Sequence, residues 1–235
     1  MEQCRKLAEV EDPIGWVQAA GIDVANSERG DKGCVAAGEG PRLTYLKEFV
    51  CPNATHLAYN LIMDSAELME QGYLDYGLPN LAALRYDPDY IGVDTVGVGV
   101  ATFNAFKDKM MDVVSLQGRQ WDEAIPLDAP EEDGGKPMYR FSNLRTQMWY
   151  EAREDLRRKR VSIDIDDEEL WSLLKLELTA PKMVVSDNMI VLEGKKEIIK
   201  RIGKSPNTAD AFVYWNWVRK GYRASPDALP MRGGG

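Results

Sequence analysis

The middle of the chain contains a strand–helix–strand pattern that limits its fold more than any other feature. Residues 90–96 are an almost wholly apolar run, residues 98–110 have the pattern of a glycine-broken helix, and residues 112–118 form a second apolar run. Strands that are apolar on both faces are typical of a sheet covered on both sides. Two such strands joined by a helix pair in parallel, so the sequence predicts an α/β fold.

Three extended segments near the N-terminus predict further strands. They are residues 16–25, 34–38 and 43–50, and the last two are separated by the turn Glu39-Gly40-Pro41. Short turns between consecutive strands favour an antiparallel meander. We therefore expect a mixed central sheet whose first three strands are antiparallel.

The remaining segments are predicted to flank this sheet. One helix is expected from Thr55 to Gly72, and a second opens at Ser142 and ends near Arg160. Further helices are expected at residues 166–178, 195–202 and 206–220, a β-hairpin at 183–194, and a surface loop at 121–140. These elements predict one domain over residues 15–222, preceded by an N-terminal segment, 1–14, and followed by a disordered tail, 223–235.

Composition excludes several classes of site. The chain has 235 residues and a net charge of −9, so it does not hold a polyanion by bulk charge. The single histidine, His56, excludes zinc centres built from several histidines. The three cysteines include no CxxC pair, which favours a reduced compartment. No apolar stretch is long enough to span a membrane, and we expect no membrane association.

Two aspartates lie in segments whose pattern predicts buried strands. Asp23 interrupts AAGIDVA, and Asp94 interrupts YIGVDTVGVGV. A buried carboxylate without a partner costs several kcal/mol or becomes protonated. Each aspartate therefore needs a cation, a set of hydrogen-bond donors, or a place at the exposed end of its strand.

A third acid, Asp210, is predicted near the start of a helix. Ser205-Pro206 is typical of an N-cap followed by a first-turn proline, and Asp210 shares the inward stripe with Val213 and Tyr214. Two divalent cations would balance the charge of three carboxylates and a bound phosphodiester. Carboxylates without histidine or cysteine partners favour Mg²⁺ or Mn²⁺ over zinc. The alternative is that these acids are structural, because acids favour helix N-termini regardless of function.

Four segments taken together resemble the nuclease domain of phage terminase large subunits, the motor proteins that package DNA. The segments begin GIDVANSERGDKG, IGVDTVGVGVATFNAF, FSNLRTQMWYEAREDL and LTAPKMVVSDNMIVLEG, and the last continues through SPNTADAFVYW. The resemblance implies a ribonuclease H-like fold and metal-dependent endonuclease cleavage of concatemeric double-stranded DNA. It also implies, as partners, an ATPase domain of the same full-length protein, the small terminase subunit and the portal, all in the host cytoplasm.

By motif, the resemblance assigns the catalytic metal ligands. They are Asp23 in GIDVA, Asp94 in GVDTVGVG and Asp210 in SPNTADA, and they would hold two Mg²⁺ or Mn²⁺ ions about 3.5–4 Å apart. Asp31 and Asn207 are candidate auxiliary ligands. Asn207 stands where the family often has an acid, so only a neutral oxygen is available there.

The ATPase signature is not present in this sequence. Gly203-Lys204-Ser205 matches the end of GxxxxGK[ST], but Ile198 occupies the position of the first glycine. We therefore expect no ATP hydrolysis by this chain.

A short basic segment is the candidate DNA-binding surface. Residues 195–204 carry five basic residues against one acid, and the basic residues are Lys195, Lys196, Lys200, Arg201 and Lys204. Contacts from these side chains to phosphates predict binding that weakens steeply with salt. Two other functions stay open: a non-catalytic docking module of the packaging motor, and a Holliday-junction resolvase or transposase-like nuclease of the same fold.

Overall fold

The computed structural model describes most of the chain with several gaps. The described residues are 1–7, 10, 17–25, 32–50, 53–76, 78, 81, 90–109, 111–117, 125–126, 138–186 and 189–220. The predicted tail at 223–235 and most of the predicted loop at 121–140 therefore lie outside the described residues.

A six-stranded mixed sheet forms the centre of the fold, in the order β5-β4-β1-β2-β3-β8. Its strands are β1 (Gln18–Asp23), β2 (Gly33–Glu39), β3 (Arg42–Phe49), β4 (Tyr90–Asp94), β5 (Val113–Leu116) and β8 (Ser162–Ile163). β1, β2 and β3 are antiparallel neighbours, whereas β4 runs parallel to β1 and β5 parallel to β4. The predicted mixed sheet and its antiparallel first three strands are confirmed.

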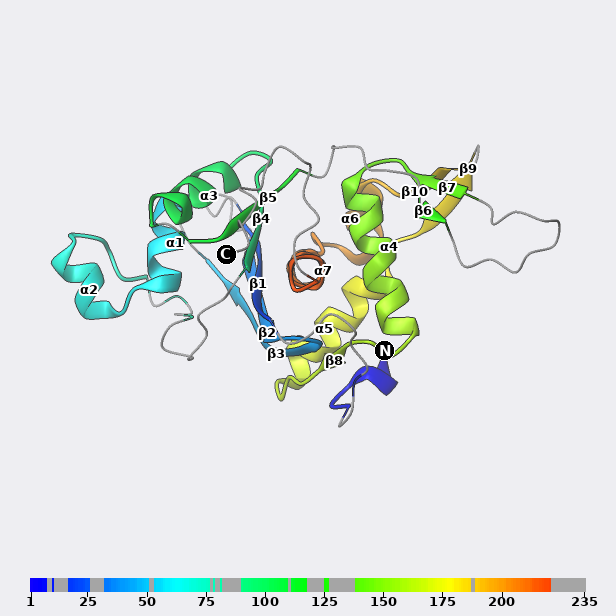
Figure 1. Cartoon of the computed structure of the whole chain (residues 1–235), viewed down its shortest axis with the longest axis horizontal. Helices are drawn as coiled ribbons and strands as arrows, with labels where there is room; N and C mark the ends of the chain where they lie inside the picture. Colours follow the sequence, from blue (N-terminus) through cyan, green and yellow to red (C-terminus); the bar gives the residue numbers. More distant parts are fainter. Residues whose placement is uncertain are drawn as a thin grey trace, which may run out of the picture.

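Helices cover both faces of this sheet (Figure 1). The helices of the described part of the chain are α1 (Ala54–Ile62), α2 (Ser65–Glu70), α3 (Gly99–Asp108), α4 (Leu144–Arg157), α5 (Glu168–Thr179), α6 (Lys195–Ile202) and α7 (Asn207–Val218). α7 lies directly on β1, β2 and β4, with α4 and α5 packed behind it. The opposite face carries α1 and α3. Separate apolar cores therefore form on the two faces, one around Phe212 and Trp215 and the other around Leu57 and Phe106.

A second, smaller sheet has the order β6-β7-β10-β9. Its strands are β6 (Ile125–Pro126), β7 (Met138–Phe141), β9 (Met183–Ser186) and β10 (Met189–Leu192). β9 and β10 are antiparallel, which confirms the predicted hairpin, and β7 runs parallel to β10. The predicted loop at 121–140 is wrong in two places, because β6 lies inside it and β7 already begins at Met138.

Local capping shifts the boundaries of two predicted helices. The helix predicted from Thr55 to Gly72 is broken into α1 and α2, because the side chain of Asp64 starts a new helix in a capping box with Glu67. Asn53, and not Thr55, caps α1. Similarly, Asn143 caps α4, which begins two residues after Ser142. Asn and Asp accept hydrogen bonds from first-turn N–H groups, and that contact decides where each helix begins.

The first residues of the chain pack against the edge of the central sheet. A 3₁₀ turn, Glu2–Cys4, buries the side chain of Cys4, and Arg5 forms a parallel β-bridge with Ile163 in β8. Residues 1–7 therefore extend the edge of the sheet. No helix among the described residues is long and apolar enough to cross a membrane.

Close packing of α7 on β1 gives the first testable prediction. A Cβ atom at Gly21 would lie 2.2 Å from both the Ala211 carbonyl oxygen and the Trp215 backbone nitrogen. Gly21→Ala must push α7 away from the sheet and is expected to lower the free energy of unfolding by about 1–3 kcal/mol or more. Urea unfolding followed by circular dichroism measures this change.

Gly194→Ala is the matched control. Gly194 has a φ of −66° and no heavy atom near the added Cβ, so alanine fits there without strain. It should change the free energy of unfolding by less than about 1 kcal/mol, because the loss of an N-cap glycine on α6 opposes the gain from a less flexible unfolded chain. Equal stability of the two variants would contradict tight packing at Gly21.

Candidate active site

Asp23 and Asp94 are the last residues of two adjacent parallel strands. β1 and β4 pair with Ile22 opposite Val93, so both strands deliver an aspartate at the same edge of the sheet. The sequence pattern placed these acids in the middle of strands, and that placement is wrong because each strand ends at its aspartate. Asp23 is nevertheless buried, with 5% of its surface exposed, because α7 covers this end of β1.

The first turn of α7 brings Asp210 to the same end of the sheet. Asp210 is buried, as its predicted inward position requires. The indole Nε1 of Trp149 in α4 donates a hydrogen bond to Asp210 Oδ1 at 3.1 Å, and Lys195 Nζ lies 3.0 Å from Oδ2. One turn further along α7, the Tyr214 hydroxyl donates to Asp94 Oδ2 at 3.3 Å. α7 therefore links the two strand-end acids to α4 and α6.

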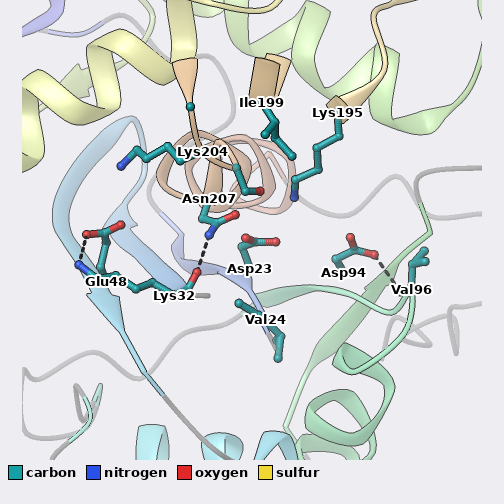
Figure 2. A pocket seen from close by; sticks show the side chains of 13 residues that line it. Asp23, Val24, Lys32, Glu48, Asp94, Val96, Lys195, Ile199, Lys204 and Asn207 are labelled. Carbon is teal, nitrogen blue, oxygen red and sulfur yellow. Dashed lines mark hydrogen bonds and ion pairs between the residues drawn. The ribbon is translucent and has the colours of Figure 1, made fainter. Parts of the chain in front are cut away.

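A cavity of about 710 Å³ opens above the strand-end acids. Figure 2 shows Asp23 between two groups of side chains: Asp94 and Lys195 on one side, and Lys32, Lys204 and their neighbours on the other. The residues that line the cavity are Asp23, Val24, Ala25, Lys32, Glu48, Asp94, Val96, Lys195, Ile199, Gly203, Lys204, Ser205 and Asn207. The cavity is thus lined by carboxylates and ammonium groups together.

Burial and mutual repulsion shift the protonation of these groups. Burial is the main cause that raises the pKa of Asp23 to about 7, and the negative charges of Asp210 and Asp94 raise it further against the opposing effect of Lys195. Burial also raises the pKa of Asp94. For Lys195, burial acts to lower the pKa, but attraction to Asp210 and Asp23 outweighs it and the pKa lies above its ordinary value. Lys195 is therefore a protonated ammonium close to Asp23 and Asp94, whose ionisation is opposed by burial.

The donor set at the cavity fits a hard divalent cation in part. Asp23 and Asp94 present carboxylate oxygens, which Mg²⁺ and Mn²⁺ prefer. However, the described residues include no group of three or more His, Cys, Asp or Glu side chains arranged to hold a metal ion. Asp210 is instead paired with Lys195. That all three acids share metal ions stays a prediction, and a metal-bound form would require Asp210 to exchange Lys195 for the ion.

The auxiliary ligands predicted from sequence have different outcomes. Asp31 lies outside the described residues. Asn207 lines the cavity, and its Nδ2 donates a hydrogen bond to the Lys32 carbonyl oxygen, which ties the start of α7 to the start of β2. A role of Asn207 as a metal ligand stays a prediction.

The predicted DNA-binding residues divide between the cavity and the outer face of α6. Lys195 and Lys204 line the cavity. Lys196 and Lys200 are exposed on α6, and Lys200 pairs with Glu197. Arg201 pairs with both carboxylate oxygens of Glu193. DNA binding by these side chains stays a prediction.

Two important residues escaped the sequence pattern. Trp149 was one of several tryptophans in the chain, and Glu177 one of several acids on a helix. Glu177 in α5 is fully buried, and its Oε2 accepts hydrogen bonds from the backbone N–H groups of Thr208 and Ala209 at 2.8 and 3.1 Å. The cap predicted from Ser205 is wrong, because α7 begins after Pro206 without a local side-chain cap and Glu177 takes that role. In the sequence, the only sign of this contact is that Glu177 lies on the inward face near the C-terminal end of α5.

Comparisons with solved structures identify the fold. A lysine-to-alanine variant of the nuclease domain of the large terminase subunit of bacterial virus Sf6, solved with manganese and beta-thujaplicinol, matches with a TM-score of 0.57 and 20% identity over 85% of this chain and 87% of that one. The nuclease domain of the same subunit without those additions matches with a TM-score of 0.56 and 20% identity over 87% and 88%. No protein-family model and no curated protein matches the sequence.

These likenesses establish that the chain has the ribonuclease H-like fold of a terminase nuclease domain, as its motifs predicted. The match covers most of both chains, so the likeness extends over most of the fold. At this level of identity the likeness establishes the fold, whereas activity must be argued from the side chains of this chain.

The raised pKa of Asp23 predicts how stability depends on pH. Its pKa is about 7 in the folded protein against an ordinary value of 3.8. Between these values the folded state keeps a proton that the unfolded state has lost, so the free energy of unfolding falls as the pH rises from about 4 to about 7. Asp23→Asn removes the titrating group and with it this fall in the free energy of unfolding. Without divalent metal and above pH 7, the variant should therefore be more stable than the unchanged protein, by at most about 4 kcal/mol.

Urea unfolding in EDTA, near pH 5 and near pH 8, measures this difference. Asp108→Asn is the control, because Asp108 is exposed at the end of α3. It should not gain stability between the two conditions. An Asp23→Asn protein that is no more stable than the unchanged protein near pH 8 would show that this carboxylate is not strained by burial.

The hydrogen bond from Trp149 to Asp210 predicts an unequal cost of two similar substitutions. Trp149→Phe leaves a buried carboxylate without one of its donors, whereas Trp215→Phe removes a buried indole Nε1 that has no hydrogen-bond partner among the described residues. Both variants lose the same side-chain volume. Trp149→Phe should therefore cost about 1.5–3 kcal/mol more in the free energy of unfolding than Trp215→Phe. Equal costs in urea unfolding would mean that the indole does not hold Asp210.

Proposed function

We propose that this chain is the metal-dependent endonuclease domain of a viral genome-packaging terminase, which cuts concatemeric double-stranded DNA by hydrolysing phosphodiesters. One observation carries the proposal: Asp23 and Asp94 end adjacent parallel strands and face one cavity, in a fold shared with the Sf6 nuclease domain. A structure of that domain holds manganese, which supports Mn²⁺ or Mg²⁺ as the cofactor here.

Asp23 and Asp94 are the residues that would hold the ions, with Asp210 as the third ligand once it separates from Lys195. When bound, two divalent ions supply an activated water and neutralise charge on the phosphate. Burial of Asp23 favours metal binding. Burial raises the pKa of this carboxyl group to about 7, which means that its charged form is destabilised, and a bound cation would offset that cost.

The surrounding side chains hold the acids in place. Tyr214 donates to Asp94 Oδ2 and the Val96 backbone N–H donates to Asp94 Oδ1. Trp149 donates to Asp210 Oδ1, and Lys195 pairs with Asp210 Oδ2. Glu177 fixes the first turn of α7 through backbone N–H groups. Lys195 balances the buried charge without metal. These contacts order the acids before any ion or substrate arrives, which lowers the cost of organising the site.

The proposed partners follow from the terminase assignment. We propose that the substrate is double-stranded DNA and that the chain works with an ATPase domain of the same full-length protein, the small terminase subunit and the portal, in the host cytoplasm.

A second function is favoured by one contact. Because Asp210 is satisfied by Lys195 and Trp149, these acids would also suit a structural role in a non-catalytic docking module of the motor. Mn²⁺ distinguishes the two functions. A metal site should raise the melting temperature, since an ion at about 100 times its dissociation constant adds about 2.7 kcal/mol to stability. A docking module should not respond.

Cleavage of plasmid DNA with Mn²⁺ tests the nuclease directly. Asp23→Asn and Asp94→Asn should each lower the cleavage rate by more than about 100-fold, because even a residue that only supports a metal ligand is worth about 10–100-fold. Asp108→Asn, at an exposed position on α3, should cut like the unchanged protein. Circular dichroism confirms that all variants fold. Undiminished cutting by the purified Asp23→Asn or Asp94→Asn protein would refute the assignment.

A further inference from the structure

The cavity is locally balanced in charge although the chain is acidic. Its lining contains the acids Asp23, Glu48 and Asp94 and the lysines Lys32, Lys195 and Lys204, in a chain of net charge −9. Lys195 is bound to Asp210, whereas the ammonium groups of Lys32 and Lys204 pair with Glu48 and Glu177. They lie together on the other side of Asp23 from Asp94 and Lys195 (Figure 2).

Lys32 and Lys204 share one arrangement. Lys32 Nζ lies 3.0 Å from Glu48 Oε2, and Lys204 Nζ lies 3.2 Å from Glu177 Oε1. In each pair the lysine is the more exposed partner: the side chains of Lys32 and Lys204 are 54% and 41% exposed, against 19% for Glu48 and 1% for Glu177. An ammonium has three N–H donors, so a single carboxylate oxygen leaves donors for a second acceptor in the cavity.

The backbone of both lysines is fixed relative to Asp23. Lys32 directly precedes β2, whose next residues pair with β1 so that Cys34 lies opposite Asp23. The Lys32 carbonyl oxygen also accepts the hydrogen bond from Asn207. Lys204 follows Gly203, which ends α6 in the left-handed conformation with a φ of +81° and so turns the chain toward the cavity. Neither lysine depends on a long loop for its position.

We propose that Lys32 and Lys204 form a phosphate subsite that binds a backbone phosphate of the DNA strand, next to the phosphate presented to Asp23 and Asp94. This assignment rests on the proposed nuclease function. Two ammonium groups in one cavity suit a singly charged phosphodiester, and their acid partners keep them in place between binding events. The subsite contacts the backbone only, so it positions the strand without reading its sequence.

This subsite is distinct from the basic face of α6. Lys196 and Lys200 do not line the cavity, and Lys200 and Arg201 are paired with Glu197 and Glu193. Lys32 was not among the basic residues that the sequence pattern selected, because it lies far from residues 195–204 along the chain. The packing of the central sheet against α7 places Lys32 and Lys204 in the lining of the same cavity.

Salt dependence of DNA binding tests the subsite. Each phosphate contact adds about 0.9 to the steepness with which the logarithm of the binding constant falls against the logarithm of salt concentration. Because the two lysines share one phosphate, Lys32→Gln/Lys204→Gln should reduce that slope by about 0.9 and weaken binding at low salt. Fluorescence anisotropy with a short labelled DNA duplex in EDTA measures both. Glutamine at Lys204 keeps an N–H group near buried Glu177, and Lys32→Gln alone should reduce the slope by less than the double variant does.

Lys6→Gln/Lys175→Gln is a matched control. These lysines are 50% and 44% exposed and also pair with acids, Asp166 and Glu2. Lys6 lies away from the cavity. It contacts β8, which pairs with the start of β3, whereas Glu48, the cavity partner of Lys32, lies near the end of β3. The control loses the same charge but should keep the slope, and Lys32→Arg/Lys204→Arg should also keep it because the positive charges remain.

The outcomes separate this proposal from the nuclease assignment. An unchanged slope in Lys32→Gln/Lys204→Gln, or an equal fall in the control, overturns the subsite even if the unchanged protein cuts DNA with Mn²⁺. A reduced slope limited to the cavity variants supports the subsite. If the unchanged protein neither cuts DNA nor gains thermal stability with Mn²⁺, the nuclease assignment fails, and a reduced slope would still establish phosphate binding in this cavity. Thermal melting shows that the variants are folded.

Discussion

The burial of carboxylates at one end of the central sheet is the constraint on which the site depends. Asp23 and Asp210 are almost fully buried, and an isolated buried carboxylate is strongly unfavourable. Lys195 reduces this cost by pairing with Asp210. The pKa of Asp23 stays raised, which shows that Lys195 does not offset the whole cost of burying that carboxylate. The structure thus keeps excess negative charge where a divalent cation would relieve it. In this view the site is destabilising without metal, as functional sites often are.

Helix α7 transmits this constraint to the rest of the molecule. It lies on β1 so closely that only glycine fits at position 21, and its first turn is held by Glu177 from α5. The same helix carries Asp210 and Tyr214, which contact Trp149, Lys195 and Asp94. A shift of α7 would therefore disturb the core and the acids together. This coupling gives the acids a rigid support, which a site made of scattered carboxylates requires.

Charge is distributed so that an acidic chain can still receive a polyanion. Three lysines face the cavity, while many other basic side chains are paired with acids on the surface. A basic segment in the sequence is consequently a poor guide to where DNA binds, because pairing with neighbours such as Glu193 and Glu197 cannot be read from spacing alone. Location in the cavity selects Lys32 and Lys204 instead.

The sequence by itself determined the mixed sheet and the hairpin at 183–194, and it singled out three acids whose metal binding stays a prediction. Apolar runs, turns and motifs are local signals, and each is encoded within a few neighbouring residues. Helix boundaries at Asp64 and Asn143 were missed because side-chain capping competes with periodicity, although the capping residues were visible. The tertiary structure alone decided that Lys195 pairs with Asp210, that Trp149 contacts Asp210 and Glu177 the first turn of α7, and that Lys32 and Lys204 line one cavity. These contacts join residues far apart in the chain, and only the packing of α4, α5 and α6 around α7 fixes their distances.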